Sequence, residues 1–265
     1  SHELRKKALK AIEDTNFYPS KGKERLKSMI ETRPDWCVSR QRVWGVPLPI
    51  FLNKKTKKIL IDEDVFENIA KIYEKEGSDC WFSDDPQKFL GKNYKSEDFE
   101  KLSDIVEVWF DSGSTHTFVL EKREDLKWPA SMYLEGSDQH RGWFHSSLLE
   151  SCGTRGRAPF ESILSHGFVV DGKGLKMSKS LGNVIAPEDI LKKYGADILR
   201  IWVASSNYAE DLRIDYSILD QHADSYRKIR NTFRYLLGNL NDDFNEIKLE
   251  NLDIEKLPEL EQYML

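Results

Sequence analysis

Little in this sequence points to a membrane span, a disulfide framework or a metal cluster. Its three cysteines, Cys37, Cys80 and Cys152, are far apart and form no C-x-x-C pair. We therefore predict free thiols in a reducing cytoplasm and no tightly bound metal. No hydrophobic run is long enough to cross a bilayer, and the N-terminal Ser-His-Glu-Leu-Arg-Lys-Lys lacks the features of a signal peptide.

An excess of positive charge is also missing, since the formal net charge is −5. This balance argues weakly against a nucleic-acid partner, although basic clusters such as residues 227–230 leave contact along a local stripe open. The length of 265 residues suits one large domain, or one large and one small domain, in a soluble globular protein. Because the chain starts without methionine and stops within an amphipathic pattern, we expect both ends to be cuts inside a longer protein.

Strand and helix patterns alternate along the first 200 residues, which predicts an α/β fold with a mostly parallel sheet. Residues 17–23 are predicted as a turn, and 46–52 as an edge strand at best, since prolines interrupt it. Amphipathic helices are predicted at 3–14, 23–31, 64–76, about 141–151, 187–194 and 196–203. Short strands are predicted at 59–61, 105–110, 132–134, 160–164 and 167–170, and a long helix at 218–240.

The segment that organises these predictions is Gly174–Asn183, GLKMSKSLGN. Its two lysines, Lys176 and Lys179, are three residues apart on a loop bracketed by glycines, with serine hydroxyls between and beside them. Such a loop can close over a polyphosphate and stabilise the charge on a leaving pyrophosphate.

A second polar loop, Glu135-Gly-Ser-Asp-Gln139, follows the strand predicted at 132–134. Gly136 allows the backbone to approach a ribose, and the side chains of Asp138 and Gln139 can bind its hydroxyls. Alternatively, Ser137 or Asp138 only caps the following helix. The loop 111–115, DSGST, is predicted to follow another strand, so all three loops are expected to meet at the carboxyl ends of the sheet.

Aromatic and histidine side chains near these loops have two interpretations each. Trp109 and Trp143 are either walls of a pocket for a branched aliphatic side chain or ordinary core residues. His140, His145 and His166 are candidate acids or bases, although lone histidines are more often structural. His140 and His145 lack the i, i+4 spacing of a helical metal pair, so no metal site is predicted. The turn 39–42, SRQR, lies between two tryptophans and is either functional or a plain surface turn.

Taken together, these motifs resemble those of the class I aminoacyl-tRNA synthetases. The pentapeptide 176–180, KMSKS, is similar to the second signature of that family. The segment 36–47, WCVSRQRVWGVP, resembles the subgroup that activates isoleucine, valine and leucine. The segments 108–114, VWFDSGS, and 133–144, YLEGSDQHRGWF, resemble the isoleucyl-tRNA synthetase family in particular.

The resemblance implies the formation of isoleucyl-adenylate from isoleucine and ATP with Mg²⁺, followed by transfer to tRNA(Ile). It implies that Lys179 acts on the pyrophosphate with the support of Lys176. The adenylate would be held by Glu135, Gly136, Asp138 and Gln139. Trp109 and Trp143 would border the isoleucine side chain. The ATP would also be contacted by His166, Phe168, Val169 and Met177.

The same resemblance implies a domain order. Residues 1–61 and 103–200 would form the C-terminal half of a Rossmann catalytic core, with a small insertion at 62–102. Residues 201–217 would be a connection, and 218–265 the start of an α-helical anticodon-binding domain that is incomplete here.

Other family elements are missing from the sequence, namely the His-x-Gly-His signature, the editing domain and a four-cysteine zinc element. We therefore expect the chain alone to be inactive and its open sheet edge to allow self-association, whereas the longer protein is monomeric. Three alternatives stay open. They are a free-standing paralogue that binds nucleotide or tRNA, a nucleotidyl transferase acting on another acid, and a purely structural domain.

Overall fold

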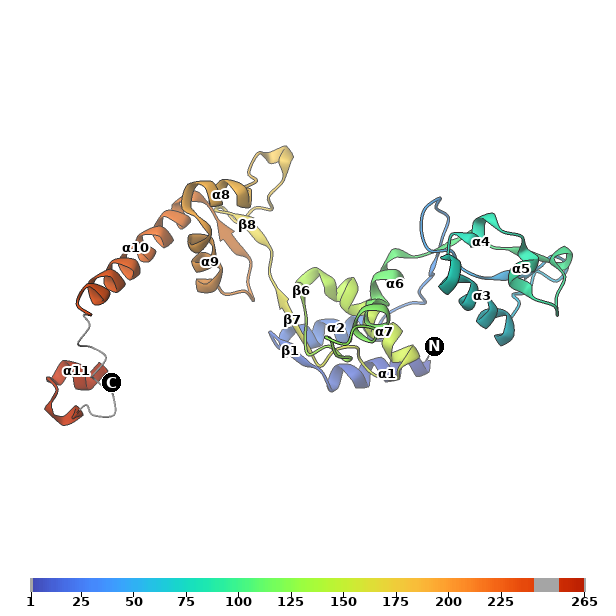
Figure 1. Ribbon diagram of the computed structural model, residues 1–265, viewed down its shortest axis with the longest axis horizontal. Helices are drawn as coiled ribbons and strands as arrows, with labels where there is room; N and C mark the ends of the chain where they lie inside the picture. Colours follow the sequence, from blue (N-terminus) through green and yellow to red (C-terminus); the bar gives the residue numbers. More distant parts are fainter. Residues whose placement is uncertain (1, 241–252, 265) are drawn as a thin grey trace. The chain divides into compact units, whose positions relative to one another are not determined.

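The computed structural model describes residues 2–240 and 253–264, and the chain divides into two compact units, residues 1–167 and 168–265 (Figure 1). The division falls inside the predicted core, so residues 168–200 fold with the helices that follow them. The predicted boundaries at 61, 102, 200 and 217 concern family domains and stay predictions. No helix in the described ranges is long and apolar enough to cross a membrane.

The first unit is built on a parallel sheet with the strand order β1-β7-β6, as expected for an α/β fold. Its strands are β1 (Asn16–Tyr18), β6 (Tyr133–Gly136) and β7 (Ser162–His166). The helices α1 (His2–Glu13), α2 (Lys21–Glu31) and α7 (Trp143–Thr154) pack with this sheet around one core (Figure 1). The core places β6 and β7 side by side, so that their carboxyl ends lie at one edge.

Residue spacing explains why these elements bury the faces they do. In α1, the buried residues Ala8, Ala11 and Ile12 recur at helical spacing. In β7, burial alternates along the strand and Ile163 is fully buried. Burying a side chain of this size stabilises the fold by about 1.5–3 kcal/mol.

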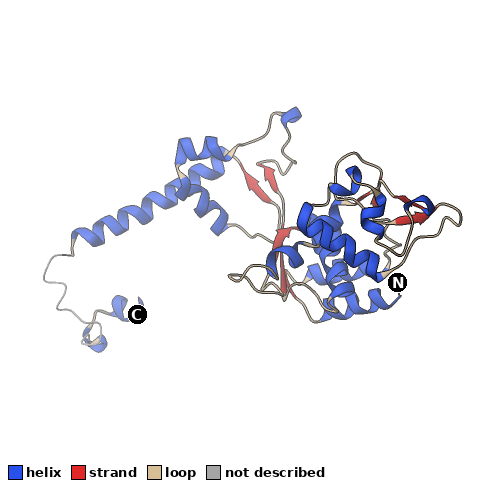
Figure 2. Ribbon diagram, turned by 45° about the vertical axis from the view of Figure 1, so that its right-hand side comes forward, coloured by secondary structure: helices blue, strands red, loops and turns tan. Residues whose placement is uncertain are grey.

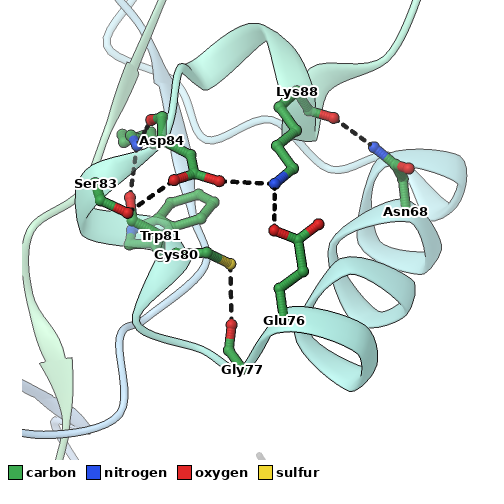
Figure 3. A network of polar contacts seen from close by, with 9 residues as sticks. Asn68, Glu76, Gly77, Cys80, Trp81, Ser83, Asp84 and Lys88 are labelled. Atoms are coloured by element: carbon green, nitrogen blue, oxygen red, sulfur yellow. Dashed lines mark hydrogen bonds and ion pairs between the residues drawn. The ribbon is translucent and has the colours of Figure 1, made fainter.

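The insertion between β3 (Phe51–Asn53) and β4 (Phe99–Lys101) has a hydrophobic core of its own, centred on the fully buried Trp81. Its helices are α3 (Glu63–Glu76), α4 (Cys80–Ser83) and α5 (Pro86–Leu90), and the 3₁₀ turn η1 (Ser96–Asp98) precedes β4. Figure 3 shows that the Lys88 ammonium links α5 to α3 and to Asp84, the residue after α4, since its Nζ lies 2.6 Å from Glu76 Oε2 and 2.7 Å from Asp84 Oδ2. The sequence predicted α3 but not the short helices, which tertiary packing stabilises.

Three sequence predictions about strands are wrong, and one of them, the strand predicted at 59–61, is only an isolated bridge between Ile59 and Leu52. Residues 16–18, predicted within or beside a turn, form β1, because β7 supplies a parallel partner along its edge. The strand predicted at 105–110 is only β5 (Ile105–Val106), which pairs antiparallel with β2 (Ser39–Arg40) in a separate ribbon. The carboxylate of Glu107 then accepts a hydrogen bond from the Trp109 amide at 3.2 Å and begins helix α6 (Val108–Gly113).

The DSGST segment is therefore helical and does not follow a strand of the parallel sheet. It leads into the π-helical turn η2 (His116–Leu120). Short apolar runs such as residues 105–110 fit a strand or a helix equally well, and here the capping carboxylate decides.

The second unit pairs β8 (Val169–Asp171) with β9 (Leu212–Ile214) in parallel. Its helices are α8 (Pro187–Tyr194), α9 (Ala196–Ser205) and α10 (Tyr216–Gly238), followed by the turn η7 (Ile254–Lys256) and α11 (Glu259–Met264). Gly195 has a φ of 83° between α8 and α9, which confirms the predicted break. Figure 2 shows how helical this unit is beside its two short strands.

The long helix predicted from 218 is confirmed as α10, and its N-cap is Asp215, whose carboxylate accepts from the Ile218 amide at 2.8 Å. Only the first turns of α10 join the core, through Leu219 and Ala223. Further along, Ile229 and Phe233 are more than half exposed. The predicted continuation of this helical domain falls partly on residues 241–252, outside the described residues.

Candidate functional site

The loop at the carboxyl end of β6 brings several of the predicted nucleotide-binding residues together. Gly136 is buried and pairs in register with His166 at the end of β7. A Cβ built on Gly136 would lie 2.8 Å from Asp138 Oδ1 and 3.7 Å from His166 Cε1. Three of the predicted nucleotide-binding residues, Gly136, Asp138 and His166, are therefore neighbours in the structure.

The other two residues of this loop are partly engaged by the protein. The exposed Glu135 accepts a hydrogen bond from the Gly136 amide through Oε2, at 2.9 Å. Gln139 accepts from the Trp143 amide through Oε1, at 2.8 Å, and so caps α7. The sequence assigned this capping role to Ser137 or Asp138, which form the 3₁₀ turn η3 (Ser137–Arg141) instead. The Asp138 carboxylate is exposed and the Gln139 amide nitrogen is available, so both can still face a ligand.

Trp109 and Trp143 lie at the meeting of α6 and α7. The Trp143 ring stacks on Tyr133 with centroids 4.0 Å apart and packs against the core, while its Nε1 donates to the Ser112 carbonyl at 3.0 Å. Trp109 is 42% exposed. Trp143 thus fits the interpretation as a core residue in part. Trp109 has the more accessible ring of the two.

The histidines of the first unit are held in neutral or structural environments. His140 is buried and its Nδ1 lies 2.8 Å from the Ser137 carbonyl. Burial, followed by the Arg33 and Arg141 charges, lowers the pKa of His145 to about 4. Only His166 is half-buried at the sheet edge, with Nδ1 2.7 Å from the Gly167 carbonyl. Of the three histidine candidates, His166 is the one that the structure places beside the β6 loop.

The lysine loop of the second unit is closed by two side chains that the sequence did not single out individually. Asn183 donates through Nδ2 to Asp171 Oδ2 at 2.8 Å and accepts from the Ser178 amide through Oδ1 at 2.9 Å. Asp171 also accepts from the Leu175 amide at 2.8 Å. We call this pair, Asp171 and Asn183, the loop clamp. The sequence signal for it is a strand-ending aspartate before Gly-Lys-Gly and an asparagine after Leu-Gly.

Both lysines of the loop project into solvent. Lys176 and Lys179 are exposed, and neither forms a salt bridge with any acidic side chain in the described ranges. Lys179 begins the 3₁₀ turn η4 (Lys179–Leu181), where Ser178 Oγ accepts from the Leu181 amide at 3.3 Å. Two free ammonium groups on a clamped loop can bind an anion such as a phosphate.

The remaining predicted ATP contacts differ in availability. Phe168 is 51% exposed and Val169 is 44% exposed, so both can offer apolar surface to a ligand. The Phe168 amide is already used, since it donates to Asp211 Oδ1 at 2.8 Å. Met177 packs against the core of the second unit, so its side chain is partly engaged there.

The expected convergence of three loops is met only in part. Both α6, with the DSGST segment, and the β6 loop belong to the first unit, where α6 packs on α7. The lysine loop belongs to the second unit, so its approach to the β6 loop stays a prediction. Among the described residues, no group of three histidine, cysteine or acidic side chains could hold a metal ion.

The turn 39–42 also has partners within the first unit. Arg40 donates through Nη1 to the carbonyl oxygens of Cys37, at 2.7 Å, and Ser39, at 2.8 Å. Trp36 lies under the Arg33 guanidinium at 5.2 Å, whereas Trp44 is 90% exposed. The arginine thus stabilises a surface turn, while the second tryptophan is unpacked.

Relatives of known sequence match the whole chain. It is 86% identical over all 265 residues to the isoleucine–tRNA ligase of Pelagibacter ubique, and this stretch makes up 29% of that protein. It is 55% identical over 262 residues to the isoleucine–tRNA ligase of Zymomonas mobilis, covering 28% of that protein. The chain therefore spans less than a third of the length of these relatives.

Solved structures confirm the predicted Rossmann-type fold. The LeuRS agnB2 of Agrobacterium radiobacter K84, solved with tRNA and LeuAMS, is similar with a TM-score of 0.54 at 21% identity, over 76% of this chain and 28% of that one. The methionyl-tRNA synthetase of Mycobacterium tuberculosis with methionyl-adenylate gives a TM-score of 0.53 at 18% identity, over 82% of this chain and 35% of that one. The family model of class I tRNA synthetases (I, L, M and V) matches residues 1–215. With its lysine loop, its β6 loop and this match, the chain belongs to the class I tRNA synthetases of the isoleucine, leucine, methionine and valine group.

Proposed function

We propose that the protein containing this chain is an isoleucine–tRNA ligase of the cytoplasm, which activates isoleucine with ATP and Mg²⁺ and transfers it to tRNA(Ile). The observation that carries the proposal is the 86% identity over the whole chain to a ligase of that specificity. The neighbouring positions of Gly136, Asp138 and His166 at the end of β6 support it, since they bring the residues assigned to the nucleotide together.

In the first step, a carboxylate oxygen of isoleucine attacks the α-phosphorus of ATP. The bond from that phosphorus to the bridging oxygen breaks, and pyrophosphate leaves with the electron pair. We assign Lys179 to the charge that develops on this leaving group, with Lys176 in support. Both ammonium groups are exposed and free of carboxylate partners among the described residues, so no internal ion pair must break first.

The residues of the β6 loop hold the adenylate in this proposal. Gly136 admits the ribose, and the Asp138 carboxylate and the Gln139 amide bind its hydroxyls. Glu135 accepts from a hydroxyl or from the isoleucine ammonium. Residues 166, 168, 169 and 177 lie along the nucleotide, and the two indoles at positions 109 and 143 border the isoleucine side chain. In the second step, a terminal ribose hydroxyl of the tRNA attacks the adenylate carbonyl and AMP leaves.

The test is isoleucine-dependent exchange of pyrophosphate into ATP, catalysed by the complete gene product. We expect Lys179→Ala to lower kcat by roughly 10²–10³-fold, as loss of a charge-stabilising group does elsewhere, with little change in the KM for isoleucine. The matched control is Lys173→Ala, an exposed lysine just before the same loop, which should keep wild-type rates. A complete protein that binds ATP or tRNA without exchange would favour the paralogue that only binds them.

A second arm uses the 265-residue chain alone. We expect no exchange, because the His-x-Gly-His signature is absent from it. A rate near that of the complete protein would overturn this expectation.

A further inference from the structure

The crossing of α6 and α7 depends on two glycines. On α6, Trp109 and Gly113 are four residues apart and so share one helix face. On α7, Gly142, Ser146 and Glu150 follow at the same spacing, beginning at the N-cap position. These two rows face each other, because a side-chain carbon at either glycine would meet the opposite row.

Gly142 lies against the indole of Trp109. A Cβ there would lie 3.0 Å from both Cη2 and Cζ3 of that ring, closer than carbon atoms normally approach, and 2.5 Å from Gln139 Oε1. Gly142 is buried, so the ring cannot move away from such a Cβ without shifting α6 or its own rotamer.

At the other end of the crossing, Gly113 likewise leaves no space for a side chain between α6 and α7. A Cβ there would lie 2.8 Å from Glu150 Cδ and 2.9 Å from Ser146 Oγ. Between the two glycines, the Trp143 Nε1 donates to the Ser112 carbonyl at 3.0 Å and ties the helices together. A side chain at either glycine would therefore require Trp109, Gln139, Glu150 or one of the two helices to move.

We propose that Gly113 and Gly142 are positioning residues that determine amino-acid selection, because they fix Trp109 relative to Trp143. This inference rests on the proposed function, in which the two indoles border the side chain of the substrate. Discrimination between isoleucine and valine depends on one methylene, worth roughly 10–200-fold in a well-fitted pocket. A shift of the Trp109 ring would make the pocket fit the isoleucine side chain less closely.

The test measures pyrophosphate exchange by the complete gene product with isoleucine and with valine. Gly113 is helical and alanine is a good helix former, so Gly113→Ala changes the contact without opposing the helix. We expect kcat/KM for isoleucine to fall by about 10- to 100-fold, since misplacement by about 1 Å can cost that much. The preference for isoleucine over valine should fall at least about threefold, with the KM for ATP within about twofold of wild type.

Rescue and control variants separate positioning from a general loss of structure. Gly113→Ala combined with Glu150→Ala removes the overlapping carboxyl and should restore most of the isoleucine preference. Gly153→Ala lies on the same helix, and its Cβ would sit at an ordinary 3.7 Å from Leu4 Cδ1, so it should behave as wild type. If Gly113→Ala does not fold, Gly142→Ala is judged by its preference for isoleucine over valine alone, because its Cβ would also meet Gln139 Oε1 of the β6 loop.

Each outcome has one meaning. If the wild-type complete protein shows no isoleucine-dependent exchange, the proposed function fails. If the wild type exchanges but a folded Gly113→Ala variant keeps its isoleucine KM and its preference over valine, or a folded Gly142→Ala variant keeps that preference, the positioning role is refuted. An equal loss in Gly153→Ala refutes it as well.

Discussion

The Glu150 carboxyl should make the stability of the first unit depend on pH in a way that glutamine abolishes. Within the described residues its Oε1 is buried and has no hydrogen-bond partner. Burial, and then the neighbouring Asp111, raises the pKa of Glu150 from 4.5 to about 8. The folded state therefore keeps this proton up to about pH 8, whereas the unfolded chain releases it near pH 4.5.

The sign and size of the effect follow from proton linkage. Stability from the neutral carboxyl is complete below pH 4.5 and is lost as the pH rises toward 8, because only the unfolded state ionises there. A pKa change from 4.5 to about 8 sets an upper limit of about 5 kcal/mol. Since Glu150 is only partly buried and its surroundings can relax, we expect about 2–3 kcal/mol.

The assay is urea unfolding of wild type and Glu150→Gln, followed by tryptophan fluorescence between pH 5 and pH 8.5. Six of the seven tryptophans precede residue 168, so the signal reports mainly the first unit. The stability of Glu150→Gln relative to wild type should rise by about 2–3 kcal/mol from pH 5 to pH 8.5. Glu24→Gln, an exposed change on α2, is the control and should show no such rise. Parallel curves for Glu150→Gln and wild type over this range would refute the reasoning.

Three further outcomes are expected. Asn183→Ala removes the loop clamp and should speed hydrogen exchange of the Ser178 amide by about 5- to 30-fold, or about 1–2 kcal/mol of local opening. Asn207→Ala in the same unit should leave that amide unchanged. Lys101→Met should destabilise the insertion by about 2–3 kcal/mol, because the Lys101 Nζ donates to the carbonyls of Trp81 and Asp84, each at 2.5 Å. Hydrogen exchange of the amides in α3–α5 measures this loss of stability, and unchanged protection would contradict the prediction. The isolated chain should self-associate through the outer edge of β6, whose backbone groups pair with no strand of the described residues on that side. Analytical ultracentrifugation at increasing protein concentration detects this association, and a monomer at every concentration would contradict it.

Contiguous motifs and helix periodicity were readable without a structure. The helix Pro187–Tyr194, with proline at its start and Gly195 after it, has the predicted bounds because its signals are local. The family was likewise evident, since KMSKS and EGSDQHRGW are runs of adjacent residues that can be recognised without knowing which residues they contact.

Pairing between distant segments, and caps that compete with another local structure, could not be predicted. β1 exists because β7 offers it a parallel edge, and α6 begins because Glu107 caps it. The Oε1 of Gln139 caps α7, while the role of its amide nitrogen at a ribose stays a prediction.

The sequence by itself determined the family, the helices with strong periodicity, and the two loops to which we assign the nucleotide chemistry. Only the tertiary structure decided that Trp109 lies on a helix, that Gly113 and Gly142 face closely packed side chains where α6 meets α7, and that Glu150 Oε1 is buried with no hydrogen-bond partner among the described residues. The physical reason is that burial, close approach and hydrogen-bond satisfaction are properties of pairs of surfaces, and these pairs form only when the chain packs.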